Sequence, residues 1–197
     1  MHLQKEFKFK HLSMDYTILL IQGAGEVTSA QEQIIVAALK SKLGDGFTII
    51  YPPMPDADTP TYLAWESVLT TNLEYLSEKV ILLGHSLGAS IILKHFSREP
   101  VPEKVIGMIL FGVPYWKDQH WDVSEYAIED EFLGNLNKLD PIYFYHSLAD
   151  EVIPDDQFRA YQKLIPKAHW RVFSGMDHSY HAAIPEMVKD IQELASA

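Results

Sequence analysis

The chain has 197 residues, a formal net charge of −11 and no cysteine. This length fits one domain with a single core, and the lack of cysteine excludes disulfides and cysteine-ligated metals. An acidic chain without a basic patch is repelled by a phosphate backbone, so nucleic acid is not an expected partner. We find no apolar run long enough for a signal peptide or a bilayer span, and we expect a cytoplasmic protein without membrane insertion.

Short apolar runs along the chain predict six β-strands. Residues 1–13 precede them and are expected to be either a loose extension or an edge strand, because Phe7 and Phe9 alternate there. The runs are almost wholly apolar, as in strands whose sheet is covered by helices on both faces. The predicted strands span residues 16–21, 47–51, 79–84, 105–112, 141–146 and 169–173.

Segments with helical signals separate these strands. Ser29 and Glu32 have the spacing of a capping box, which predicts a helix that opens there and ends at Gly44. Thr59 and Pro60 offer an N-cap and a first-turn proline for the next helix. This alternation predicts an α/β fold, a three-layer sandwich around a mostly parallel sheet of about six strands. The other predicted helices follow residues 86, 154 and 185.

The segment of residues 114–139 interrupts the alternation. It is rich in aromatic and acidic residues, and it is too long for a simple connection between two strands. We expect it to form an α-helical crossover together with a small cap-like segment. No repeat and no Pro/Gly linker divides the rest of the chain, so residues 14–197 are predicted to form one domain.

A serine flanked by glycines follows the third predicted strand. The segment Gly84-His85-Ser86-Leu87-Gly88 fits the pattern G-x-S-x-G between an apolar strand and a helix-like run. In this setting a serine lies on a sharp strand-to-helix turn whose strained backbone exposes the hydroxyl. The glycines are then needed because side chains would collide with the neighbouring backbone. A serine that only caps the next helix is the alternative, so a nucleophile needs a base and an acid as partners.

His178 is the predicted general base, because it follows the last predicted strand on a loop that can reach back over the sheet. His181 is the alternative, although it falls where the last helix should begin. Asp150, which follows the preceding strand, is predicted to orient the base. Asp177 adjoins His178 but is badly placed to accept from its ring. The other acidic candidates are Glu151, Asp155 and Asp156.

Two backbone amides are predicted to bind the oxyanion that acyl transfer creates. One is the N–H of Leu87, directly after Ser86, and the other is the N–H of Ala24 in the loop after the first strand. Gly23 and Gly25 would let that loop approach closely. An ordinary glycine turn is the alternative interpretation of the same loop.

Two segments resemble other kinds of site. The segment GAGEVT follows a strand as a dinucleotide-binding fingerprint does, but Thr28 occupies the third glycine position and no acidic residue ends the next strand. His178 and His181 have the spacing of a metal pair with Asp177 beside them, but the pattern lacks a third ligand at known spacing. We therefore expect no cofactor and no metal.

The segments GHSLG, HSLADEVIP and GMDH occur in the order Ser, Asp, His. With them the chain, from about residue 16 to its end, resembles a small member of the α/β-hydrolase family. The resemblance implies a serine hydrolase with an acyl-enzyme on Ser86 and a substrate that is an ester, thioester, lactone or amide. Two features depart from the family pattern. Gln22-Gly23 stands where His-Gly is usual, and the first strands of the family's full sheet are missing or reduced to the N-terminal residues.

The aromatic residues of the 114–139 segment are candidates for contact with the substrate. Tyr115, Trp116 and Trp121 lie in the connection that passes over the nucleophile in this fold, although they could instead pack the connection onto the sheet. The acidic residues of the same segment should repel anions. We therefore expect a carboxylesterase-like enzyme for a small, neutral ester. A thioesterase, an amidase and a weakly active interaction protein on the same fold are the alternatives.

Overall fold

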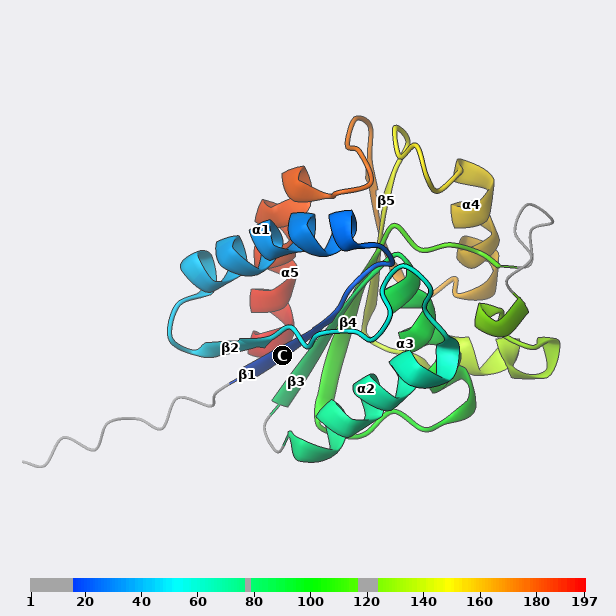
Figure 1. Ribbon diagram of the computed structural model, residues 1–197, viewed down its shortest axis with the longest axis horizontal. Helices are drawn as coiled ribbons and strands as arrows, with labels where there is room; N and C mark the ends of the chain where they lie inside the picture. The colour runs from blue at the N-terminus through cyan, green and yellow to red at the C-terminus, as the bar shows by residue number, and fades with distance from the viewer. Residues whose placement is uncertain (1–15, 77–78, 117–123) are drawn as a thin grey trace, which may run out of the picture.

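The computed structural model describes residues 16–76, 79–116 and 124–197. Its strands form one sheet in the order β2-β1-β3-β4-β5-β6 (Figure 1), and every described strand pair is parallel. All six predicted strands are present, each within one residue of its predicted bounds. The strands are β1 (Tyr16–Ile21), β2 (Phe47–Ile50), β3 (Lys79–His85), β4 (Val105–Phe111), β5 (Ile142–Ser147) and β6 (His169–Phe173).

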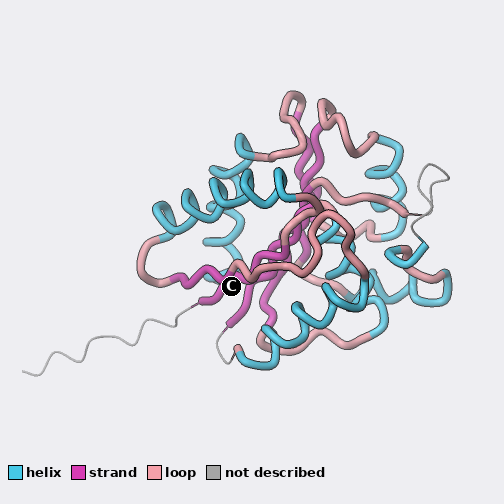
Figure 2. Tube along the Cα trace, in the orientation of Figure 1, coloured by secondary structure: helices cyan, strands magenta, loops and turns pink. Residues whose placement is uncertain are grey.

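Helices cover both faces of the sheet, as the apolar strands predicted. The helices α1 (Glu26–Leu43) and α5 (Ile184–Ser196) cover one face. The other face is covered by α2 (Tyr62–Tyr75), α3 (Leu87–Arg98) and α4 (Asp155–Leu164) (Figures 1 and 2). The fold is therefore the expected three-layer α/β sandwich. None of the described helices is long and apolar enough to cross a membrane.

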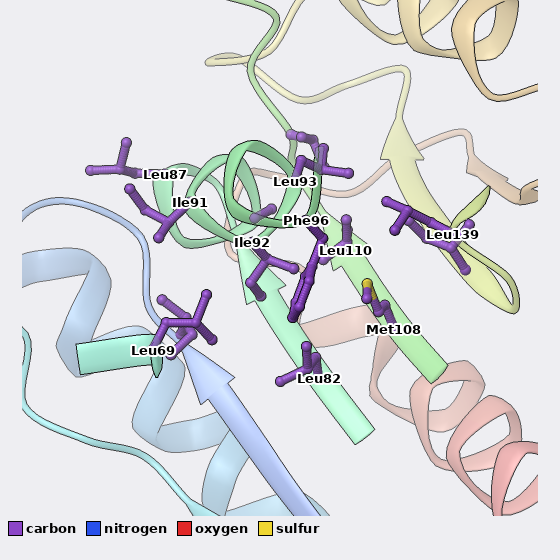
Figure 3. Close-up of a cluster of buried hydrophobic side chains, with 14 of the residues drawn as sticks. Leu69, Leu82, Leu87, Ile91, Ile92, Leu93, Phe96, Met108, Leu110 and Leu139 are labelled. Atoms are coloured by element: carbon purple, nitrogen blue, oxygen red, sulfur yellow. The ribbon is translucent and has the colours of Figure 1, made fainter. Parts of the chain in front are cut away.

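Each inner strand contributes side chains to two separate cores. In β1, Leu19 and Ile21 pack under α2 and α3, whereas Ile18 and Leu20 pack under α1 and α5. Figure 3 shows the first of these cores, where Ile92 and Phe96 of α3 meet side chains of β3 and β4. Burial on both faces explains why the strand sequences do not alternate between apolar and polar residues.

Two helices begin at other residues than the capping signals predicted. The helix α1 begins at Glu26, so the capping-box interpretation of Ser29 and Glu32 is wrong, and it ends at Leu43 with the expected Gly44 as its C-cap. The helix α2 begins after Thr61, two residues beyond the predicted cap. Its first N–H, on Tyr62, donates to the carboxylate of Glu125 at 3.0 Å. A distant side chain thus supplies the cap, which no local pattern could indicate.

The segment between β4 and β5 forms 3₁₀-helices in its described part, where an α-helix was expected. They are η1 (Ser124–Tyr126) and η2 (Asp130–Lys138), and η2 lies against α3 and α4. The Nζ of Lys94 donates to the carbonyl of Glu125, which ties η1 to α3. The predictions for residues 1–13 and for Trp121 fall outside the described residues.

Candidate active site

Ser86 occupies the single residue between the end of β3 and the start of α3. Its backbone has φ 48° and ψ −116°, a region that costs a non-glycine residue on the order of 1–3 kcal/mol. Two backbone hydrogen bonds hold this turn: the Ser86 N–H donates to Phe111 at 2.9 Å, and the Ser86 carbonyl accepts from Ser90 at 3.2 Å. The turn has the strained geometry expected of an exposed serine nucleophile.

The glycines around Ser86 allow two close approaches of the backbone. A Cβ on Gly84 would lie 2.7 Å from the Cα of Ala89 in α3. A Cβ on Gly88 would lie 2.2 Å from the carbonyl oxygen of Ile21, at the end of β1. Strand and helix thus pass each other as the sequence pattern predicted, and a larger residue at either position would push α3 away from the sheet.

The loops after β5 and β6 bring Asp150 and His178 together. The His178 Nδ1 lies 2.9 Å from Oδ2 and 3.0 Å from Oδ1 of Asp150. The Asp150 side chain is fully buried, and its Oδ1 accepts the N–H groups of Val152 and Ile153. Its Oδ2 accepts the phenol of Tyr180 at 2.9 Å. The carboxylate therefore has a fixed position from which it can orient the imidazole.

The protonation of Asp150 follows from these contacts. Burial alone would raise the pKa of this carboxyl, but its hydrogen bond to His178, the charge interaction with that ring and the backbone amides outweigh burial. The pKa of Asp150 is consequently lower than that of a free aspartate, and the group stays ionised at neutral pH. An ionised carboxylate at this position favours the tautomer with the proton on Nδ1, so Nε2 can accept a proton.

The alternative candidates for the acid and the base make other contacts. Asp177 accepts the N–H and hydroxyl of Ser179, while Glu151 accepts the backbone N–H of His178 at 3.3 Å. The Nε2 of His181 lies 2.8 Å from the carbonyl oxygen of Gln31 in α1. Asp155 pairs with Arg159 in α4. Within the described ranges, no three potential ligand side chains are arranged to hold a metal ion.

The backbone of residues 23–25 leaves one amide free beside Ser86. The Gly23 N–H donates to Glu32 at 2.8 Å, and the Gly25 N–H donates to the Ala57 carbonyl at 2.8 Å. Between them, the Ala24 N–H has no partner among the described residues. The Leu87 N–H is the first of α3, where amides lack intrahelical acceptors. Both predicted oxyanion residues border the same cavity.

A cavity of about 480 Å³ opens at the ends of the strands that supply these residues. Ser86 and His178 both line it. Trp116 and Tyr126 form one wall with ring centroids 5.2 Å apart, and the Trp116 indole donates to the Ser90 hydroxyl at 2.8 Å. Burial and the nearby Glu125 carboxylate raise the pKa of Tyr126 to about 12, so this wall has a neutral phenol. The remaining lining residues are Ala24, Thr28, Pro60, Leu87, Pro114, Glu125 and Val152.

The aromatic residues predicted to contact the substrate divide into three cases. Trp116 lines the cavity. Tyr115 does not line it: its ring packs against Tyr161 of α4 at 5.3 Å. Trp121 lies outside the described residues. Neighbours in the sequence therefore lie in different environments, since Tyr115 belongs to the core beneath the connection and Trp116 to the cavity wall.

Part of the chain matches a known protein family. A family model described as serine hydrolase matches residues 51–132, which include the G-x-S-x-G segment. This match supports a serine hydrolase, and the chain has the α/β-hydrolase fold. No curated protein matches the sequence.

Solved structures with a similar fold include three enzymes. A variant of the meta-cleavage product hydrolase CumD shares 15% identity at a TM-score of 0.70, covering 91% of this chain and 90% of that chain. An esterase from Exiguobacterium antarcticum shares 16% at 0.66, with 92% of each chain covered. A thioesterase domain from the curacin biosynthetic pathway shares 12% at 0.67, with 91% of each covered. At such identities the likeness shows the fold alone.

Sequence reasoning missed two residues of the candidate site. Tyr180 donates to Asp150 from a left-handed backbone conformation (φ 55°), and no motif indicated it. Glu32 is buried beside the Ala24 loop. A signal for Glu32 was present, because it shares the helical spacing of Ile35 and Leu39, which face the core. A carboxylate on an apolar helix face requires buried partners.

Proposed function

We propose that this protein is a serine hydrolase that cleaves small, neutral esters by acyl transfer to Ser86. The observation that supports this most strongly is that Ser86, on its strained turn, shares a cavity with His178, whose Nδ1 is held by Asp150. In this mechanism His178 Nε2 takes the Oγ proton as Oγ bonds to the ester carbonyl carbon. The proton then passes to the departing alkoxide as the ester C–O bond breaks. Water, activated by the same imidazole, hydrolyses the acyl-enzyme.

The N–H groups of Ala24 and Leu87 are proposed to stabilise the oxyanion of each tetrahedral intermediate. Both residues border the cavity next to Ser86, and the neighbouring amides of Gly23 and Gly25 are already engaged. Loss of one such donor typically lowers kcat by about 10²–10³-fold. The replacement of the usual His-Gly by Gln22-Gly23 is compatible with this role, because the donors belong to the backbone.

The preference for a neutral substrate rests on the cavity lining. The lining residues include one acidic side chain, Glu125, and neither lysine nor arginine. The wall of Trp116, Tyr126 and Val152 offers apolar surface for an acyl group. A negatively charged substrate would be placed beside Glu125 without a lining cation. Contact of Trp121 with the substrate stays a prediction.

The test is a hydrolysis screen over acyl chain lengths and leaving groups, with esters, thioesters and amides in parallel. Ser86→Ala should abolish turnover and labelling by a fluorophosphonate without unfolding the protein. Equal labelling of wild type and Ser86→Ala would contradict the proposal and favour a binding protein. A preference for thioesters or amides would replace the ester assignment.

Trp116→Ala tests the acyl pocket, with Tyr115→Ala as the matched control. Truncation of Trp116 should shift the preferred acyl length toward longer chains, because it removes a wall of the cavity. Truncation of Tyr115 removes an aromatic ring that packs on Tyr161 instead, so the preference should not change. If both variants keep the wild-type profile, the acyl group binds elsewhere.

A further inference from the structure

A buried carboxylate lies behind the catalytic turn. Glu32 of α1 is 1% exposed, and three donors surround it. Its Oε1 accepts the Gly23 N–H at 2.8 Å and lies 2.5 Å from His85 Nδ1. Its Oε2 accepts the Tyr51 phenol at 2.8 Å. Burial and the Glu32 carboxylate raise the pKa of Tyr51, so this phenol remains a donor.

His85 connects this carboxylate to the proposed base. Its ring is 1% exposed and stacks on Phe111 with centroids 4.7 Å apart. Its Nε2 lies 2.9 Å from the backbone carbonyl oxygen of His178. A carbonyl oxygen can only accept, so Nε2 must bear a proton. A second proton is shared between Nδ1 and Glu32, since two acceptors cannot form this contact without one.

These contacts join three separate loops. The Gly23 amide adjoins Ala24, His85 precedes Ser86, and the last acceptor is the backbone of His178. The connection thus runs from the oxyanion loop, through the residue before the nucleophile, to the loop of the base. A displacement of about 1 Å between such groups can lower a rate by on the order of 100-fold.

We propose that Glu32 and His85 are positioning residues that hold the oxyanion loop and the His178 loop in register with Ser86. The contacts from Gly23 through Glu32 and His85 to His178 are called the bridge below. The inference rests on the proposed function, because the bridge has a role only in that reaction. Neither side chain lines the cavity, so neither touches the substrate. Their contribution should consequently appear in kcat and in the binding of transition-state analogues, and KM should change little.

Glu32→Gln tests the bridge with little change of shape. If the Gln oxygen takes the place of Oε1, a neutral His85 has one N–H for two acceptors, and an imidazolium would be buried without a counter-charge. If the Gln NH2 takes that place, it can donate to His85 Nδ1, but the Gly23 N–H loses its acceptor. One end of the bridge is therefore lost. We expect kcat to fall about 10–100-fold with KM within about twofold, and a boronic acid that forms a tetrahedral adduct on Ser86 to lose affinity in proportion.

Tyr51→Phe is the matched control. It removes the third donor to Glu32 but leaves the contacts to Gly23 and His85 intact, so kcat should stay within about twofold of wild type. His85→Asn is a second variant, in which the Asn amide can still donate to Glu32 but no longer reaches His178. Its kcat should also fall, and it decides the test if Glu32→Gln does not fold.

The outcomes separate the two proposals. If Ser86→Ala is inactive while folded Glu32→Gln or His85→Asn keeps wild-type kcat, the bridge does not position the site and the proposed function stands. The same conclusion holds if Tyr51→Phe loses as much kcat as Glu32→Gln, because the loss would then follow from any change around Glu32 and not from the bridge. If Ser86→Ala keeps wild-type turnover, the proposed function fails, and with it the role of the bridge.

Discussion

The Asp150 carboxylate accepts a phenol as well as the His178 ring. Tyr180 donates to Oδ2 at 2.9 Å and accepts the Ser147 N–H at 3.3 Å, and it is fully buried. Burial, followed by the charge of Asp150, raises the pKa of Tyr180, so the phenol keeps its proton. A neutral donor between the end of β5 and the carboxylate fixes the position of Asp150 beside the imidazole of His178.

Tyr180→Phe should lower kcat about tenfold or less and leave KM nearly unchanged, because Asp150 remains ionised but loses one restraint. A hydrogen bond to a charged group contributes roughly 1.5–3 kcal/mol, so the free energy of unfolding should fall by a similar amount. Tyr145→Phe is the control, since its buried phenol donates to Asp190 at 2.6 Å on the α5 side. Urea denaturation should show comparable losses for the two variants, and only Tyr180→Phe should lose kcat.

His146 gives the fold a dependence on pH. Its ring stacks on Phe158 with centroids 4.4 Å apart, and its Nε2 has no hydrogen-bond partner among the described residues. Burial lowers the pKa of this histidine, although the carboxylates of Asp155 and Asp150 oppose the shift. The unfolded chain therefore takes up the proton first as the pH falls. The stability that neutral His146 contributes is fully present above about pH 6.5. It is lost progressively as the pH falls toward the pKa of His146 in the folded protein.

His146→Phe should flatten that dependence, because Phe keeps the stacked, buried ring and cannot be protonated. We expect the free energy of unfolding of the wild type to fall more steeply between pH 7 and pH 5 than that of the variant. Urea denaturation at pH 5, 6, 7 and 8 measures both. Parallel pH profiles would mean that His146 does not contribute to acid destabilisation.

The residues of the site differ in how far the sequence could predict them. Ser86, Asp150 and His178 could be proposed because each follows a recognisable strand and the nucleophile has local glycine signals. Glu32 and Tyr180 owe their importance to partners far along the chain: His85 is 53 residues from Glu32, and Asp150 is 30 residues from Tyr180. No local pattern encodes such pairs.

At the scale of elements, the crossing of α3 over the end of β1 determines where Ser86 lies. The Gly88 backbone fits against the carbonyl oxygens of Ile21 and Gln22, and a Cβ there would lie within 2.4 Å of both. The end of β1 and the first turn of α3 are thus fixed relative to one another. The oxyanion loop follows β1 directly, so the same contact sets its distance from the nucleophile.

Gly88→Ala should push α3 outward and disturb both Ser86 and Leu87. Overpacking against backbone typically costs about 1–3 kcal/mol, and labelling of Ser86 by a fluorophosphonate should slow markedly. Gly134→Ala is the control, because a Cβ at Gly134 meets nothing within 4 Å. Denaturation and labelling rates of the two variants should differ clearly. A Gly88→Ala protein with wild-type stability and labelling would contradict the close packing.

Strands were predicted better than helix starts, for a physical reason. The apolar runs of β1 and β3 are local features that burial on both faces requires. The start of α2 depends on Glu125, 63 residues away, which caps Tyr62. Glu32 was misassigned because its spacing from Ser29 fits a cap, while its actual partners are the residue after β2, a residue of β3 and the loop after β1.

At the scale of the whole molecule, the proposed catalytic groups gather at one edge of the sheet. Ala24 follows β1, Ser86 follows β3, Asp150 follows β5 and His178 follows β6. In a parallel sheet the carboxyl ends of all strands lie on the same side, where ligands bind in open α/β folds. The parallel topology thus assembles a site from residues more than 150 positions apart.

The net charge of −11 should add a long-range contribution to substrate choice. The field of an acidic protein lowers the local concentration of anions, and salt screens it: the Debye length falls from about 30 Å at 0.01 M to about 3 Å at 1 M. The kcat/KM for an ester with a remote carboxylate should therefore rise severalfold over this range of NaCl. A neutral ester of the same acyl length should show little change.

Glu125→Gln separates the local from the global effect. Gln can still accept the Tyr62 N–H through its oxygen, so the cap of α2 is kept while the charge in the cavity is removed. At low salt this variant should hydrolyse the anionic ester faster than the wild type, yet its rate should still increase with NaCl because the other acidic residues remain. If the anionic and neutral esters are hydrolysed equally at 0.01 M NaCl by the wild type, neither Glu125 nor the overall charge selects the substrate.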